Sequence, residues 1–94
     1  MTNDNIATEA LAAVNGPRRA DYGPVEENFA RIARFWSAYL QNIGHDVTLS
    51  AGDVAPMMRM VKEARLCRTP AHRDSLVDLV GYALLGADMS GVKE

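Results

Sequence analysis

Residues 62–78, KEARLCRTPAHRDSLVD, gather many charged side chains in a short run. Four cations and a histidine stand beside three carboxylates: Lys62, Arg65, Arg68, Arg73, His72, Glu63, Asp74 and Asp78. Such a group can form ordinary salt bridges between neighbouring helices. It can also hold an anionic ligand, since lysine offers a point charge and arginine a bidentate fork to phosphate. The stretch therefore predicts either a structural charge network or a phosphate-binding site.

The positions of these charges on two predicted helices separate the cations from the acids. At 100° per residue, Asp74 and Asp78 share a stripe of the last predicted helix with apolar neighbours. Arg65 and Arg68 are expected on the inner side of the preceding helix, with Lys62 at its border. A buried carboxylate without a partner is costly, so Asp78 needs a cation, a metal or N–H donors. These groups either pair with one another or line a ligand pocket.

A second candidate anion site is the connection at residues 16–23, GPRRADYG, which precedes a predicted helix N-terminus. Arg18 and Arg19 supply charge, Tyr22 could stack on a base, and backbone N–H groups at a helix start attract anions. Such loops are also plain connectors, so both interpretations stay open. His72, in the first turn of the last predicted helix, is either solvated or in contact with a ligand phosphate.

No other motif in the sequence indicates catalysis or metal binding. The phosphate-loop, dinucleotide-binding and metalloprotease motifs are missing. Cys67 is the only cysteine, which excludes an intrachain disulfide and zinc sites built from two or four cysteines. It lacks histidine and acid partners arranged for nucleophilic catalysis, so packing is its expected role. Trp36 and Tyr39, at helical spacing, are expected in the core.

Size and composition limit the class of protein. Ninety-four residues, 48% of them hydrophobic, predict one domain over residues 1–94. The net charge of −2 argues against a partner that is a nucleic-acid polymer or a membrane surface. No apolar run is long enough to span a bilayer, and the N-terminus lacks the features of a signal peptide. We expect a cytoplasmic protein.

Helical periodicity predicts an all-α fold, a compact bundle of about four helices. The helices are expected at about residues 4–14, 24–43 and 54–68, and from Pro70 to about Ala87 or Asp88. Asp53 is the expected cap of the third helix, with a Ser50–Asp53 capping box as its rival, and Thr69 is the expected cap of the fourth. The second helix carries a continuous apolar stripe: Val25, Phe29, Ile32, Trp36, Tyr39 and Ile43. The inner face of the third helix is expected to be apolar and to consist of Met57, Met58, Val61 and Ala64.

The fourth predicted helix is apolar on nearly every side between Leu76 and Leu85. A helix without a polar face must be surrounded, either by its own bundle or by another copy of the chain. A chain of this length buries a modest share of its surface. We therefore expect a homo-oligomer that assembles through this C-terminal helix.

Several segments together resemble a family of small phage-encoded helical proteins. The pattern includes R-x-x-Y-G-P-x-x-x-N-F from Arg19, F-W-S-A-Y-L from Phe35, M-M-x-x-x-K-x-A-R from Met57 and H-R-D-S-L-V-D-L-V-G-Y-A from His72, and it covers about residues 18–85. That family is similar in layout to the MazG-like all-α nucleotide pyrophosphohydrolases and to phage proteins of nucleotide modification. The resemblance implies phage origin, a helical bundle and dealings with nucleotides.

The sequence departs from the MazG-like pattern where those enzymes hold Mg²⁺. They use an E-x-x-E pair on one helix and an E-x-x-D pair on the next, and the ion positions the attacking water. Here Lys62-x-x-Arg65 stands at the first position, and Ser75 stands three residues before Asp78. Two cations in place of two carboxylates should repel Mg²⁺ and favour phosphate.

These observations lead us to expect a non-catalytic binder that sequesters a phosphorylated nucleotide without a cofactor. In a phage, it would act as a sponge against a cyclic or ADP-ribose-type signal of host immunity, in the host cytoplasm. The expected ligand-binding residues are Arg18, Arg19, Tyr22, Lys62, Arg65, His72, Asp74 and Asp78. One alternative is a divergent Mg²⁺-dependent nucleotide pyrophosphohydrolase, whose metal ligands would come from Asp74, Asp78 and either Glu63 or Glu27. The other is an interaction protein whose charge network is purely structural.

Overall fold

The computed structural model describes residues 2–16 and 24–90, and these form four helices. The helices are α1 (Thr2–Asn15), α3 (Val25–Asn42), α4 (Ala51–Arg68) and α5 (Arg73–Ser90). The described residues contain no strand, so the all-α prediction is confirmed. None of these helices is long and apolar enough to cross a membrane.

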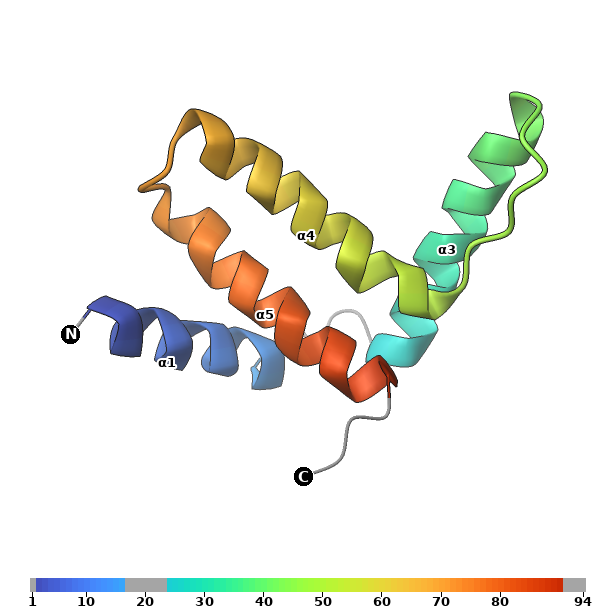
Figure 1. Cartoon of the computed structure of the whole chain (residues 1–94). Coiled ribbons are helices and arrows are strands. Elements are labelled where there is room, and N and C mark those ends of the chain that lie inside the picture. The colour runs from blue at the N-terminus through green and yellow to red at the C-terminus, as the bar shows by residue number, and fades with distance from the viewer. Residues whose placement is uncertain (1, 17–23, 91–94) are drawn as a thin grey trace.

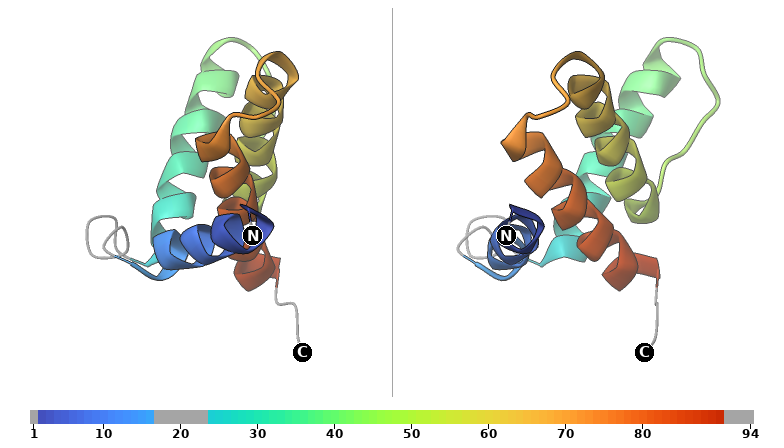
Figure 2. Two further views of the ribbon diagram at one scale, coloured as in Figure 1. Left: turned by 90° about the vertical axis from the view of Figure 1, so that its left-hand side faces the viewer. Right: turned by 60° about the vertical axis from the view of Figure 1, so that its left-hand side comes forward.

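Helix α5 lies between α1 and α4, and α3 packs mainly against the first half of α4 (Figure 1). α4 and α5 run side by side in opposite directions, joined by a short turn, and α1 crosses α5 on the side away from α4 (Figures 1 and 2). The second half of α3 projects away from α1 and α5 (Figure 1).

A small cluster of buried side chains joins α3 to α4. It consists of Phe29 and Ala33 of α3 with Val54 and Ala55 of α4. Three of the four are small, so the two helix backbones can approach closely at this point. Partly buried side chains of α3, the following loop, α4 and α5 pack around the cluster: Val25, Ile32, Trp36, Leu49, Ala51, Met58, Tyr82, Leu85 and Met89.

The apolar character of α5 is satisfied within the chain to a large extent. Ser75, Val77 and Gly81 are buried, and most other apolar side chains of the helix are half-buried between α1 and α4. On the α1 side, a Cβ built at Gly81 would lie 3.7 Å from Cγ2 of Val14, which shows how closely the two helices pass. The C-terminal helix expected to carry an oligomer contact is therefore the central helix of this bundle.

Helix α4 begins earlier than the Asp53 cap predicted. Ser50 is the N-cap, and its backbone N–H donates to Oδ2 of Asp53 at 2.8 Å while its hydroxyl lies 3.2 Å from the same oxygen. The rival capping box is thus the one that forms. Pro56 consequently lies inside the helix, where its missing N–H removes one backbone hydrogen bond.

Helix α5 begins later than predicted, at Arg73, so the assignment of Thr69 as its cap and Pro70 as its first residue is wrong. Thr69 instead ends α4, and its N–H donates to the carbonyl of Arg65 at 3.0 Å. The N–H of His72 then donates to the carbonyl of Thr69 at 3.0 Å, which closes a turn before α5 starts. The residue that caps α5 is therefore His72.

The connection between α3 and α4 is tied to one side of α3. Gly44 has a φ of +102°, a conformation that favours glycine at the end of a helix. The hydroxyl oxygen of Ser37 accepts a 2.8 Å hydrogen bond from the N–H of Leu49, and the Gln41 amide donates to the carbonyl of Val47 at 2.9 Å. These bonds hold the loop along the Ser37 and Gln41 side of α3.

Candidate functional site

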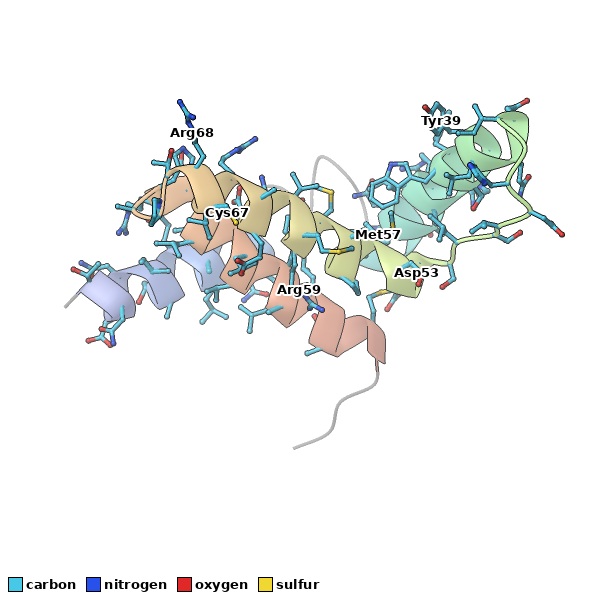
Figure 3. All side chains as sticks on the ribbon, turned by 45° about the horizontal axis from the view of Figure 1, so that its top comes forward. Tyr39, Asp53, Met57, Arg59, Cys67 and Arg68 are labelled. Carbon is cyan, nitrogen blue, oxygen red and sulfur yellow. The ribbon has the colours of Figure 1, made fainter. Side chains whose placement is uncertain are left out.

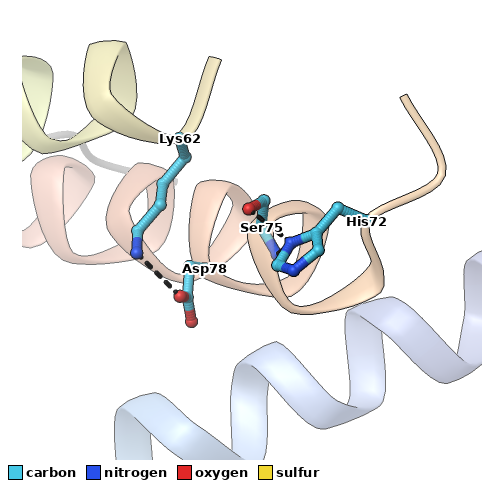
Figure 4. Close-up of polar contacts among 4 residues, drawn as sticks. All are labelled: Lys62, His72, Ser75 and Asp78. Atoms are coloured by element: carbon cyan, nitrogen blue, oxygen red, sulfur yellow. Dashed lines mark hydrogen bonds and ion pairs between the residues drawn. The ribbon is translucent and has the colours of Figure 1, made fainter. Parts of the chain in front are cut away.

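Two residues of the charged stretch form an ion pair with each other, between α4 and α5. Nζ of Lys62 on α4 lies 3.0 Å from Oδ2 of Asp78 on α5 (Figure 4). The side chains are 13% and 31% exposed, so water reaches the carboxylate more readily than the ammonium. The pair joins the second half of α4 to the first half of α5, and an ion pair between these helices is what the structural interpretation of the sequence predicts.

Arg65 and Arg68 do not lie on the inner side of α4, so this part of the prediction is wrong. Both are exposed, as are Val61 and Ala64 of the face expected to be inward. The side of α4 that meets α5 is instead a stripe at four- and three-residue steps, consisting of Ala55, Arg59, Lys62 and Leu66, all of them buried or half-buried. Two contacts show that this stripe faces α5. Lys62 forms an ion pair with Asp78, and Ala55 and Arg59 pack beside Gly86.

A second ion pair joins α1 to α5 near the surface. Nη2 of Arg73 lies 2.8 Å from Oε2 of Glu9, and the side chains are 46% and 50% exposed. Asp74, its neighbour, is exposed and takes no part in either ion pair among the described residues. Asp74 and Asp78 thus have different surroundings although they lie one turn apart on the same helix.

His72 forms a local contact with α5 rather than facing the Lys62–Asp78 pair (Figure 4). The backbone N–H of Ser75 lies 3.2 Å from Nδ1 of His72, and the Ser75 hydroxyl lies 2.7 Å from the same nitrogen. An Nδ1 that accepts from the backbone N–H carries no proton, so the hydroxyl must donate to it as well. The imidazole therefore acts as the N-cap of α5.

The pairing of His72 with Ser75 does not make a nucleophile. Ser75 is 0% exposed, so no substrate carbon or phosphorus can reach its hydroxyl oxygen. The Ser75 hydroxyl is hydrogen-bonded to Nδ1 of His72, and the side chain is buried in the first turn of α5. The sequence did not predict this contact, because His72 followed by Ser75 does not match the usual capping box of Ser or Thr followed three residues later by Glu or Gln.

The acidic residues of the enzyme alternative are not brought together. Glu63 and Asp74 are exposed, and Asp78 is paired with Lys62. In the part of the chain that the structure describes, no three His, Cys, Asp or Glu side chains lie close enough to share a metal ion. Arg18, Arg19 and Tyr22, the other predicted site residues, lie outside the described residues.

Several exposed apolar side chains lie on or beside α3 and α4. Phe35 and Tyr39 of α3 are 72% and 66% exposed, Ile43, which directly follows α3, is 55% exposed, and Met60 and Val61 of α4 are 62% and 47% exposed. Met60 lies about 200° around α4 from Met58, which packs against the cluster shared with α3, so it faces another side. We call Phe35, Tyr39, Ile43 and Val61 the α3–α4 apolar surface. Figure 3 shows Tyr39 near the outer end of α3, and Met57, which neighbours this surface, on α4. The predicted core position of Tyr39 is therefore wrong.

One signal in the sequence could have revealed this surface. Phe35 directly precedes Trp36 and falls outside the apolar stripe that was assigned to the core. A large aromatic side chain off the inward stripe must either be exposed or meet another element. The exposure of Tyr39 and Ile43 had no such signal, because both lie on the stripe itself.

Comparison with known proteins places the chain among phage proteins. The chain is 42% identical over 79 residues to a Gene 55 protein of Mycobacterium phage L5, which covers 84% of this chain and 48% of that protein. It is 40% identical over 81 residues to a Gene 55 protein of Mycobacterium phage D29, which covers 86% of this chain and 50% of that protein. The chain thus spans about half the length of the curated relatives it matches. No solved structure matches it.

These matches confirm the resemblance to phage-encoded proteins, and no MazG-like protein is among them. Residues 5–90, which include all four helices almost entirely, match a family described as a domain of unknown function, DUF6378. The chain therefore belongs to the DUF6378 family.

Proposed function

We propose that this protein acts by contact with another protein chain through the α3–α4 apolar surface, and that its charged residues between helices are structural. The observation that carries the proposal is the exposure of Phe35 and Tyr39, at 72% and 66%, one turn apart on α3. Scattered exposed apolar residues are ordinary on a folded protein. Two large aromatic side chains exposed one turn apart on the same helix are typical of a protein interface, where aromatic residues are enriched.

The state of the charged residues supports the same proposal. Lys62, one of the cations expected to bind phosphate, already has Asp78 at 3.0 Å. A phosphate that took Lys62 would leave a carboxylate that is 31% exposed without its partner, beside the new anion. Such an exchange is unfavourable unless further cations join, and Arg65 is exposed rather than turned towards this pair.

Affinity capture from phage-infected cells tests the proposal. The tagged wild-type chain, the Tyr39→Glu variant and the Leu11→Glu control are compared, since Leu11 is 53% exposed on α1, away from the surface. A specific protein should be enriched by the wild type and the control and lost with Tyr39→Glu, because a carboxylate resists burial in an apolar contact. Equal capture by all three chains would contradict the proposal.

A second candidate function is the binding of a phosphorylated nucleotide, including a cyclic or ADP-ribose-type signal. The observation in its favour is that Arg65 and Arg68 are exposed and form no ion pair with the other described residues. Two guanidinium groups near the end of one helix could hold phosphate oxygens in bidentate fashion. The same arginines also complement the negative end of the α4 dipole, which requires no ligand.

Calorimetric titration with nucleotides separates these candidates. A nucleotide binder should bind equally in EDTA and in Mg²⁺ and release its ligand unchanged, with affinity lowered about 10-fold or more in Arg65→Ala/Arg68→Ala. Release of pyrophosphate that requires Mg²⁺ would instead support the enzyme alternative. An absence of binding by wild type in both conditions would leave the protein-contact proposal as the one to pursue.

A further inference from the structure

We infer that α1 is a strap that opens from α5 while α3, α4 and α5 stay folded together, and that its opening uncovers one side of α5. The inference goes beyond the proposed function, because it concerns a part of the molecule away from the α3–α4 apolar surface. Three observations carry it: the position of α1 outside the central cluster, the few side chains that it buries, and the exposure of its ion pair with α5.

The first observation is that α1 lies outside the packing that joins the other helices. Among the described residues, the central cluster and the side chains packed around it come from α3, the following loop, α4 and α5, and none comes from α1. α1 packs mainly against α5, which it crosses on the side away from α4 (Figures 1 and 2). Loss of the α1 contact would therefore leave the central cluster intact.

The second observation is that α1 buries few side chains. Ala10 is buried, Ile6, Ala13 and Val14 are half-buried, and the other ten residues of the helix are exposed. The four inward positions are spaced by three and four residues, so α1 meets α5 along one narrow stripe. Two of the four are alanines, which bury little apolar area. Because hydrophobic stabilisation follows the apolar area removed from water, this contact holds α1 more weakly than the central cluster holds the other helices.

The third observation is the exposure of the polar contact between α1 and α5. In the part of the chain that the structure describes, Arg73–Glu9 is the one ion pair that α1 forms with another helix. Its side chains are 46% and 50% exposed. Water screens an ion pair with this exposure, so the pair adds little to the docking of α1.

The side of α5 that α1 covers can be identified from the same contacts. Arg73 pairs with Glu9, and a Cβ built at Gly81 would lie 3.7 Å from Cγ2 of Val14. Val77 lies between Arg73 and Gly81 at steps of four residues, so it shares their side of the helix. It is 6% exposed and does not belong to the central cluster. Opening of α1 should therefore expose Val77.

Cysteine labelling of the folded chain tests the inference. In a Cys67→Ser background, which removes the exposed native thiol, Val77→Cys places a thiol under α1 and Val54→Cys places one in the central cluster. Below the unfolding transition, the Val77→Cys chain should be labelled at least about 10-fold faster than the Val54→Cys chain, because a local opening exposes the first thiol alone. Its labelling rate should also respond little to denaturant, since the opening of one helix exposes little new surface.

Two substitutions in α1 supply the matched comparison within the Val77→Cys chain. Val14→Ala should speed the labelling about 5-fold, because it removes part of the contact with α5. Weaker helix formation could not explain this result, since alanine favours a helix more than valine does. Leu11→Ala, at a 53% exposed position of the same helix, should leave the labelling rate unchanged.

Hydrogen–deuterium exchange of the wild-type chain gives a measurement that needs no substitution. Protection factors of α1 amides should be at least about 10-fold lower than those in the middle of α4 and α5. The inference is overturned if the two labelled valine positions react at the same rate, or if Val14→Ala acts no differently from Leu11→Ala. It is also overturned if α1 amides share the protection and denaturant dependence of those in α4 and α5, because the four helices would then open as one cooperative unit.

Discussion

Lys62 and Asp78 form an ion pair across the α4–α5 contact, with 3.0 Å between Nζ and Oδ2. The ammonium-bearing side chain is 13% exposed and the carboxylate-bearing one 31% exposed. The lysine is one of the residues that the sequence predicts as a phosphate ligand, and in the structure it has an acid of the neighbouring helix as its partner. The ion pair joins α4 to α5.

The first prediction concerns the energetic coupling of this pair. Asp78→Asn should lower the free energy of unfolding by about 1–2 kcal/mol, because the poorly exposed ammonium of Lys62 loses its counter-charge. Lys62→Met should cost about 0.5–1 kcal/mol, since water can partly solvate the carboxylate that remains. The double variant Lys62→Met/Asp78→Leu should return to within about 1 kcal/mol of wild type, because an apolar pair can replace a charged one. Chemical denaturation measures these chains, and the double variant Lys62→Met/Asp78→Asn closes the double-mutant cycle that gives the coupling energy of the pair.

The Arg73–Glu9 pair is the control for this experiment. Its side chains are 46% and 50% exposed, so Arg73→Met should change the free energy of unfolding by about 0.5 kcal/mol or less. If Asp78→Asn proves as mild as Arg73→Met but alters nucleotide binding, the Lys62–Asp78 pair belongs to a ligand site and the structural account is wrong.

The second prediction concerns His72 as the N-cap of α5. His72→Ala removes the acceptor for the backbone N–H of Ser75, which lies 3.2 Å from Nδ1, and should cost about 1 kcal/mol. His72→Asp should retain most of the stability, because a carboxylate at this position accepts the same N–H and favours the positive end of the helix dipole. Thermal unfolding measures both variants. Equal losses for alanine and aspartate would show that His72 does not act as a cap.

The third prediction compares two glycines of α5. Gly81→Ala should raise the free energy of unfolding by about 0.5–1 kcal/mol, because alanine favours the helix and its Cβ would meet Val14 at an ordinary 3.7 Å. Gly86→Ala should gain less, since its Cβ would lie 3.2 Å from Nη1 of Arg59 and 3.4 Å from Cβ of Ala55. Chemical denaturation of the two variants provides the comparison. A larger gain at Gly86 than at Gly81 would contradict the described packing of α5.

Much of the fold could be predicted from the sequence because its local signals agree with its packing. Gly16 and Gly44 mark the ends of two helices, and the stripe on α3 from Val25 to Trp36 does meet the core. The helix starts were less certain. Ser50 and Asp53 were both acceptable caps, and the choice between them depends on hydrogen bonds that the sequence does not show.

The charged residues could be predicted only in part. The pairing of an acid on the last helix with a cation on the preceding one was among the predicted outcomes, and Lys62–Asp78 confirms it. Arg65 and Arg68 were misplaced because the inner face of α4 was inferred from Met58 and Val61. The helix turns a different stripe towards α5, and Val61 is 47% exposed.

The exposure of Tyr39 and Ile43 could not be predicted from periodicity. A stripe indicates which side of a helix is apolar, but not how far along that side a neighbouring helix extends. The divergence of α3 from α4 depends on the small side chains Ala33, Val54 and Ala55 at their contact and on the hydrogen-bonded course of the loop. These features become visible only in the folded chain.

Hydrogen–deuterium exchange of the wild-type chain, alone, with a protein recovered by affinity capture and with nucleotides, tests the central claim most directly. If the α3–α4 apolar surface is the functional contact, amides in the second half of α3 and the middle of α4 should gain protection when the captured protein is added. Nucleotides should leave the amides around Lys62, His72 and Asp78 unchanged. Protection that develops around those three residues with nucleotide, while α3 exchanges at the same rate with and without the captured protein, would contradict the account.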